Sequence, residues 1–202
     1  MFMSQRIGLF GGTFDPPHMG HLEAALAAKR TFLLHRLLFV VANDPWQKST
    51  ERTLIEARHR LTMVRMLVEG VAGVEASDLE IVRGGPSYTI ETVTELRDQG
   101  NEVILVVGAD TAAGLDTWER ASELRELVEV AVVDRPGCVL PELQGWRFQR
   151  VVTESPNISS SGVRDLVGDR SSTHDSVPPA IRDYILRQDL YQPDWSENQH
   201  PR

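Results

Sequence analysis

The sequence predicts an α/β fold in which a mostly parallel, doubly wound sheet of five or six strands carries helices on both faces. Short apolar runs of strand length, such as residues 37–42 and 102–107, alternate along the chain with helical patterns such as residues 56–69. A continuous apolar run is typical of a parallel strand that helices cover on both faces. The expected architecture is therefore Rossmann-like, with a ligand crevice at the carboxyl ends of the strands.

Length, charge and cysteine content narrow the class of protein. The 202 residues fit one α/β domain with a substantial core, which we expect over residues 1–190, followed by a disordered tail at 191–202. The formal charge of −8 argues against a surface that binds polyanions, so nucleic acid is not an expected partner. A single cysteine, Cys138, excludes an internal disulfide. With no signal-peptide pattern or long apolar segment, we expect a cytoplasmic protein that does not contact a membrane.

The most informative stretch is residues 11–21, Gly-Gly-Thr-Phe-Asp-Pro-Pro-His-Met-Gly-His, between the apolar run 7–10 and a helical segment at 22–28. Paired glycines let the backbone turn tightly and approach a ligand, and the N-terminus of the following helix favours an anion. His18 and His21, three residues apart at the helix start, project to the same side. The stretch predicts a polyphosphate site, and the alternative is an ordinary turn with surface histidines.

The middle of the chain continues the alternation of strands and helices. Residues 56–69 carry a helical apolar stripe that predicts core packing, formed by Leu61, Met63, Val64, Met66, Leu67 and Val68. Residues 74–82 are expected to be extended, and residues 83–87 break that segment. A new helix is expected from residue 88, with Ser87 or Thr89 as its cap and other N–H groups of its first turn available to a carboxylate.

Polar residues follow two of the expected strands directly. Asn43 and Lys48 lie in the loop after residues 37–42, where Lys48 is a candidate phosphate contact and Asn43 a candidate substrate contact. Gly108 and Asp110 follow residues 102–107, and a carboxylate there suits the hydroxyls of a ribose. The simpler interpretation of Lys48 is a solvated loop lysine.

The last third of the chain contains a second phosphate-binding pattern. Residues 127–133 read as a helix end followed by a strand, residues 147–153 as the last strand, and residues 177–188 as a closing helix. Residues 158–164, Ile-Ser-Ser-Ser-Gly-Val-Arg, place serines at a helix N-terminus with Arg164 one turn inside, whose fork of N–H groups suits phosphate. Ordinary N-capping is the alternative for the serines.

These motifs carry a family resemblance. Thr13, His18, Gly20 and His21 reproduce the (T/S)xxxxHxGH signature of the nucleotidyltransferase superfamily, and the longer GGTFDPxHxGH form resembles nicotinate-nucleotide adenylyltransferases. Pro17 departs from the aliphatic residue that is usual in that family. Residues 158–164 resemble the family's ISS(T/S)xxR motif, and the resemblance extends over residues 6–164.

The resemblance implies transfer of the AMP part of ATP to nicotinate mononucleotide, with Mg²⁺ carried on the ATP phosphates and no dedicated metal ligand in the protein. The implied catalytic residues are His18, His21, Lys48 and Arg164. The implied ATP contacts are Gly11, Gly12, Thr13, Phe14, His18, His21, Gly108, Arg135, Ser159, Ser160 and Arg164. The implied acceptor contacts are Thr13, Asn43, Lys48, Thr89, Asp110 and Trp118, with the Trp118 ring stacked on the pyridine.

Three alternatives remain open from the sequence. A sibling adenylyltransferase for nicotinamide mononucleotide or pantetheine phosphate shares the phosphate motifs, and only the surroundings of Thr89 and Trp118 argue against it. A nucleotide sensor without catalysis would bind ATP without turnover. A class I tRNA synthetase fragment would need a KMSKS-like loop and a tRNA-binding domain, which the sequence lacks. The oligomeric state is left open, a homo-oligomer included.

Overall fold

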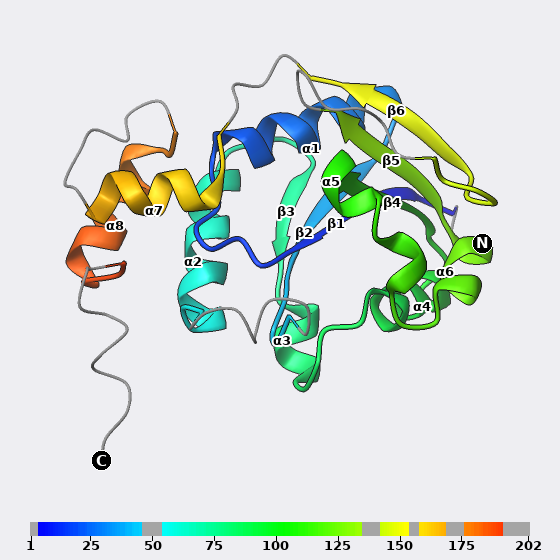
Figure 1. Ribbon diagram of the computed structural model, residues 1–202, viewed down its shortest axis with the longest axis horizontal. Helices are drawn as coiled ribbons and strands as arrows, with labels where there is room; N and C mark the ends of the chain where they lie inside the picture. Colours follow the sequence, from blue (N-terminus) through cyan, green and yellow to red (C-terminus); the bar gives the residue numbers. More distant parts are fainter. Residues whose placement is uncertain (1–3, 46–53, 135–141, 154–157, 169–175, 192–202) are drawn as a thin grey trace.

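The computed structural model describes residues 4–45, 54–134, 142–153, 158–168 and 176–191. A single twisted sheet runs through the molecule, with helices in front of and behind it (Figure 1). Its strands are β1 (Arg6–Gly12), β2 (Arg36–Val41), β3 (Val74–Ser77), β4 (Glu102–Gly108), β5 (Glu129–Asp134) and β6 (Phe148–Val152). The spatial order is β3-β2-β1-β4-β5-β6 and every pairing is parallel. The predicted Rossmann-like, doubly wound α/β fold is confirmed.

The helices of the described residues fall between and after these strands. They are α1 (Met19–Thr31), α2 (Ala57–Val68), α3 (Leu79–Arg83), α4 (Thr89–Asp98), α5 (Ala109–Ala112), the 3₁₀ turn η1 (Leu115–Thr117), α6 (Ala121–Leu127), α7 (Ser160–Gly168) and α8 (Pro179–Arg187). The predicted helices at residues 56–69 and 177–188 are confirmed within a few residues.

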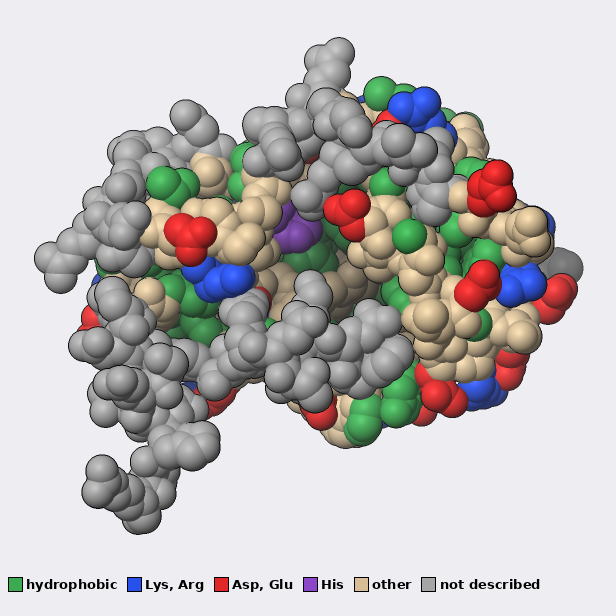
Figure 2. Space-filling view, viewed as in Figure 1, with side chains coloured by type: hydrophobic (Ala, Val, Ile, Leu, Met, Phe, Trp, Pro, Cys, Tyr) green, Lys and Arg blue, Asp and Glu red, His purple; other side chains and the backbone are tan. Residues whose placement is uncertain are grey.

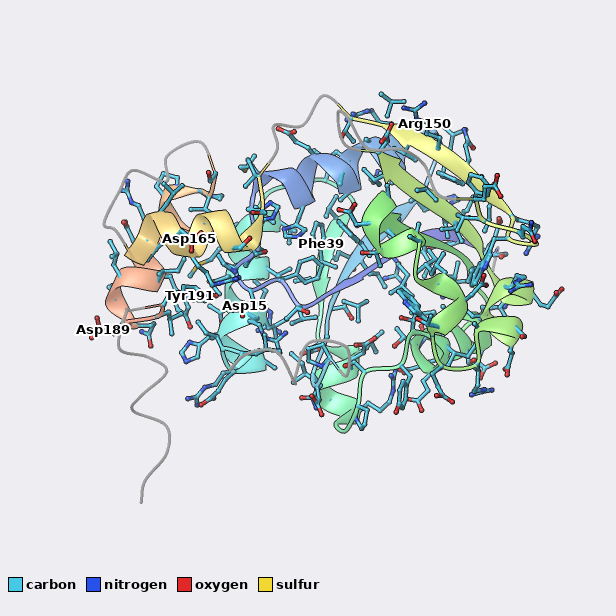
Figure 3. The ribbon with its side chains drawn as sticks, viewed as in Figure 1. Asp15, Phe39, Arg150, Asp165, Asp189 and Tyr191 are labelled. Carbon is cyan, nitrogen blue, oxygen red and sulfur yellow. The ribbon has the colours of Figure 1, made fainter. Side chains whose placement is uncertain are left out.

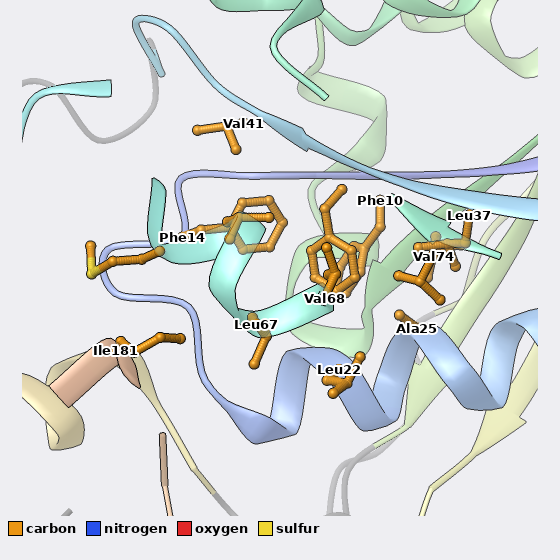
Figure 4. Packing of buried hydrophobic residues seen from close by; sticks show 14 of the residues in the cluster. Phe10, Phe14, Leu22, Ala25, Leu37, Val41, Leu67, Val68, Val74 and Ile181 are labelled. Carbon is orange, nitrogen blue, oxygen red and sulfur yellow. The ribbon is translucent and has the colours of Figure 1, made fainter. Parts of the chain in front are cut away.

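Side chains that alternate along β1 divide the core into two layers. Phe10 points to one face of the sheet, where it packs with residues of α1, α2 and α8 (Figure 4). Ile7 and Leu9 point to the other face, against α4 and α6. Since a strand residue and its neighbour face opposite sides, the apolar run 7–10 of β1 requires both layers. Helices therefore cover both faces, and the glycine-rich segment after β1 emerges at the centre of the sheet.

Two local expectations were wrong, both near β3. The segment predicted as extended over residues 74–82 is a strand only to Ser77, after which α3 begins. The last β3 pair is Val40 with Ser77, and β2 itself ends at Val41, so a longer β3 would have no partner there. Neither predicted residue caps α4. Tyr88 is the N-cap and Thr89 is the first helical residue, while the Ser87 hydroxyl accepts the N–H of Asn43 at 2.8 Å.

Candidate active site

A cleft of about 430 Å³ opens at the carboxyl ends of β1, β4 and β5, as expected for the switch point of a doubly wound sheet. We call it the first cleft. Figure 2 shows a histidine side chain within a hollow near the middle of this face. The predicted residues that line the first cleft are Gly11, Gly12, Thr13, Phe14, His18, His21, Gly108, Asp110, Ser159, Ser160 and Arg164.

The two histidines of the first motif form one stacked unit. Their ring centroids are 3.7 Å apart and the planes meet at 27°. The backbone N–H of His18 donates to Nδ1 of His21 at 3.2 Å, so in the neutral His21 ring the proton lies on Nε2. The ring of Phe14 meets the His21 ring edge-on at a centroid distance of 5.1 Å. Both imidazoles are thus held in place at the cleft, as the i, i+3 spacing predicted.

The glycines of the site differ in whether a Cβ atom would fit in their place. A Cβ on Gly12 would come within 2.8 Å of the Phe14 ring, so Gly12 serves the packing of the turn. Among the described residues, a Cβ on Gly11 or on Gly108 would meet no atom within 4 Å. These two glycines lie at the carboxyl ends of the adjacent strands β1 and β4 and line the first cleft. Their open side therefore offers bare backbone to a ligand.

The second motif lies directly against the first. Arg164 donates from Nη1 to the backbone carbonyl of Asp15 at 2.7 Å, and the Ser160 hydroxyl donates to the carbonyl of Pro16 at 2.9 Å. The Ser159 hydroxyl accepts the N–H of Gly162 at 3.1 Å, so Ser159 caps α7. The N-cap role that was the alternative for the serines thus applies to Ser159, which still lines the cleft. The first turn of α7 and Arg164 face the histidine pair across one cleft.

A second cleft of about 160 Å³ adjoins the first, and we call it the second cleft. Thr89, at the first position of α4, and Trp118 both line it. Gly11, Gly12 and Thr13 line both clefts, as does Thr111. Of the predicted acceptor contacts, Thr89 and Trp118 therefore lie in the second cleft, Thr13 lies where the two clefts meet, and Asp110 lies in the first cleft.

Three predicted site residues are not among those that line the clefts. Lys48 and Arg135 lie outside the described residues. Asn43 does not line either cleft, because its side-chain nitrogen donates to the carbonyl of Gly85 at 2.9 Å and its backbone N–H pairs with Ser87. The geometry places Asn43 in the support of the site, and a direct substrate contact by it has no support in the structure.

Several residues near the clefts escaped the sequence analysis. Asp15 is 2% exposed and its Oδ1 accepts the hydroxyl of Tyr191 at 2.6 Å; the two side chains lie together beside α8 (Figure 3). Arg60, within the stripe predicted as core, donates to the backbone carbonyl of Thr13. Thr111 follows Asp110 and reaches both clefts. The charge of Arg60 inside an apolar stripe was the one local signal available.

The described residues contain neither a cluster of metal ligands nor a helix that could span a membrane. Within that part of the chain, histidine, cysteine and carboxylate side chains do not gather in threes around a point where a metal ion would fit. The helices there are also too short or too polar to cross a membrane.

The sequence of the chain matches the family model described as cytidylyltransferase-like over residues 9–166. It is 34% identical to the probable nicotinate-nucleotide adenylyltransferase of Desulfatibacillum aliphaticivorans, across 92% of this chain and 99% of that protein. It is 39% identical to the protein of the same name from Methylibium petroleiphilum, across 94% and 93%. The chain belongs to the cytidylyltransferase-like family and, within it, to the nicotinate-nucleotide adenylyltransferases.

Solved structures of this family share the fold. The nicotinic acid mononucleotide adenylyltransferase of Plasmodium falciparum, complexed with NaAD, aligns with a TM-score of 0.76 and 19% identity over 93% of this chain and 97% of that one. The same enzyme complexed with APC aligns with a TM-score of 0.74. The membership of the chain in the nicotinate-nucleotide adenylyltransferases makes it a nucleotidyltransferase.

Proposed function

We propose that the protein joins nicotinate mononucleotide to the AMP part of ATP, which yields nicotinate adenine dinucleotide and pyrophosphate in NAD biosynthesis. The observation that carries the proposal is the pair of clefts that meet at Gly11, Gly12 and Thr13. ATP occupies the first cleft and the mononucleotide the second. Their reacting phosphates then meet over the glycine turn, where backbone N–H groups and the start of α1 favour negative charge.

The reaction requires no nucleophile from the protein. The phosphate of the mononucleotide is largely ionised near neutral pH and attacks the α-phosphorus of ATP, while the bond from that phosphorus to the bridging oxygen breaks and pyrophosphate leaves. Catalysis then consists of positioning two anions and stabilising the charge that moves onto the leaving group. A general base and a covalent intermediate are both unnecessary.

The cationic and polar residues of the first cleft supply that stabilisation. His18 and His21 contact the α-phosphoryl group and the leaving pyrophosphate, because they are the polar side chains fixed at the start of α1. Arg164 and the first turn of α7 bind the phosphates from the opposite wall. Lys48 and Arg135 are expected to add charge. Mg²⁺ enters with ATP as part of the substrate and keeps most of its water ligands.

The second cleft selects the acceptor. The N–H groups of the first turn of α4, which begins at Thr89, have no partner four residues earlier within the helix and suit a carboxylate. Trp118 offers an aromatic face to the pyridine ring. Asp110, in the first cleft, is expected to accept the hydroxyls of a ribose. We expect the enzyme to work in the cytoplasm as one domain over residues 1–190, with a homo-oligomer left open.

One assay tests the function against its alternatives. Pyrophosphate release from ATP is measured with nicotinate mononucleotide, nicotinamide mononucleotide and pantetheine phosphate as separate acceptors. We expect turnover with the nicotinate compound to exceed that with the other two. Preference for either of the others would assign the chain to a sibling adenylyltransferase, and ATP binding without turnover would indicate a sensor.

A further inference from the structure

Arg60 is the largest fully buried side chain of the described residues, with 1% of it exposed. It lies in the first half of α2 and is not among the residues that line either cleft. A guanidinium stays charged in proteins, and burial of that charge is costly unless its N–H groups are satisfied. The partners of the Arg60 N–H groups therefore show which segments this buried charge connects.

The guanidinium of Arg60 joins three separate segments through backbone carbonyls. Nη1 donates to Thr13 at 2.8 Å, Nη2 donates to Asn43 at 3.2 Å, and Nε donates to Ile55 at 2.8 Å. Thr13 belongs to the turn after β1 and lines both clefts, and Asn43 follows β2. The planar guanidinium of Arg60 thus connects the glycine turn after β1 to the loop after β2 and to the start of α2.

Further hydrogen bonds connect Asn43 to the segment that leads into α4. The Asn43 backbone N–H donates to the Ser87 hydroxyl at 2.8 Å, and its side-chain nitrogen donates to the Gly85 carbonyl at 2.9 Å. The Ser87 N–H in turn donates to the carbonyl of Asp44 at 2.9 Å. Ser87 lies in the second cleft two residues before α4 begins. One path of hydrogen bonds from the turn at Thr13 to the start of α4 therefore passes through Arg60.

We propose that Arg60 is a positioning residue that holds the turn at Thr13 and the loop at Asn43 in one arrangement and thereby aligns the first cleft with the second. The inference rests on the proposed function, which assigns ATP and the mononucleotide to these clefts. Arg60 acts through Thr13 and Asn43 without contacting either substrate. An in-line attack between two bound phosphates depends on such alignment, since a shift of about 1 Å costs on the order of a hundredfold in rate.

A lysine cannot replace this group. Its ammonium is a single point on a flexible stem, whereas the three carbonyls of Thr13, Asn43 and Ile55 are met by N–H groups that diverge from one rigid plane. Arg60→Lys keeps the charge and loses the simultaneous contacts. The substitution therefore tests the alignment of the three segments while the positive charge is kept.

The test compares Arg60→Lys with the control Met63→Ala, which opens a cavity at a fully buried position less than one turn further along α2. Thermal unfolding establishes the folded fraction, and calorimetry gives Kd for a non-hydrolysable ATP analogue and for nicotinate mononucleotide. In Arg60→Lys we expect both Kd values to rise by about tenfold and kcat/KM per folded molecule to fall on the order of a hundredfold. In Met63→Ala we expect a lower unfolding temperature with both Kd values unchanged.

Folded Arg60→Lys protein with unchanged Kd values and unchanged kcat/KM would overturn the proposal, as would the same changes in Met63→Ala. If Arg60→Lys fails to fold, the half-buried Asn43→Ala variant replaces it, because it removes only the contact to Gly85. We expect that variant to raise the Kd for nicotinate mononucleotide and to leave the Kd for the ATP analogue unchanged. An unchanged Kd for the mononucleotide would contradict a role of the hydrogen bonds that run from Asn43 toward α4. Wild-type protein that does not use nicotinate mononucleotide would refute the proposed function, while the ATP-analogue Kd still tests Arg60 at the first cleft.

Discussion

The hydroxyl of Tyr191 donates a hydrogen bond of 2.6 Å to Oδ1 of Asp15, across 176 positions of the chain. Both residues are buried, with 9% and 2% exposed. Asp15 belongs to the glycine-rich motif, and its backbone carbonyl also accepts Arg164. The segment after α8 thus supports the same turn that the second motif contacts.

Tyr191→Phe tests the contribution of this bond to stability. Removal of the hydroxyl takes a donor from a buried carboxylate oxygen, which should lower the free energy of unfolding by about 1–3 kcal/mol. Denaturant unfolding measures it. Tyr184→Phe is the matched control, since the Tyr184 hydroxyl bonds His59 at 2.8 Å in a more exposed setting and should cost less. Equal losses in both variants would remove any special role of Asp15.

Gly11→Ala tests whether the open side of β1 receives a ligand. A Cβ there would meet no atom of the described residues within 4 Å, so the unfolding temperature should stay unchanged while the affinity for an ATP analogue falls. Gly12→Ala is the contrast, because its Cβ would lie 2.8 Å from the Phe14 ring and overpacking costs typically about 1–3 kcal/mol. Thermal unfolding and calorimetric titration give both quantities. Undiminished ATP-analogue affinity in Gly11→Ala would show that no ligand approaches that backbone.

His21→Ala tests charge stabilisation in the first cleft. Loss of one preorganised donor should lower kcat by about 10²–10³-fold with the fold intact, measured as pyrophosphate release per folded molecule. The control His59→Ala removes a histidine that contacts Tyr184 outside the residues lining the clefts, and it should leave kcat unchanged. Near-normal turnover in His21→Ala would contradict the assignment of the histidine pair.

Trp118→Ala tests how the acceptor is recognised. Loss of the aromatic face should raise KM for the mononucleotide. Much of the preference for nicotinate over nicotinamide should remain, because we place that preference on backbone N–H groups near Thr89. A carboxamide would turn its NH₂ toward such a donor, and each unmet buried donor costs about 1–3 kcal/mol, so two mismatches give on the order of a hundredfold or more. The stacking role fails if KM is unchanged, and the nicotinate assignment fails if wild-type protein uses both acceptors equally.

Much of the site could be predicted from the sequence because its parts are local. The pairing of His18 with His21 could be predicted from their i, i+3 spacing at the start of a helix. The place of the serines in the cleft could be predicted because they stand at the start of the helix that carries Arg164. The family resemblance added Thr89 and Trp118, which the structure brings to one cleft. Whether the residues of the two clefts contact the substrates, and whether Lys48 and Arg135 contact ATP, stays a prediction.

Local patterns misled where distant segments decide the structure. Leu79 and Ile81 are spaced as they would be in a strand, yet the partner strand β2 ends too early to pair with them. Asn43 also follows a strand, and its backbone N–H and side-chain nitrogen donate to Ser87 and Gly85. Whether it contacts the substrate stays a prediction.

The sequence by itself determined the parallel sheet, the glycine-rich turn after β1 and most of the helices, since apolar periodicity and glycine placement act within a few residues of the chain. Only the tertiary structure decided that Arg164 reaches Asp15, that Tyr191 supports the same aspartate, and that Arg60 joins Thr13 to Asn43. These are hydrogen bonds between buried or half-buried groups 17 to 176 positions apart. No local pattern encodes such a bond, because its partners meet only when the helices pack on the sheet.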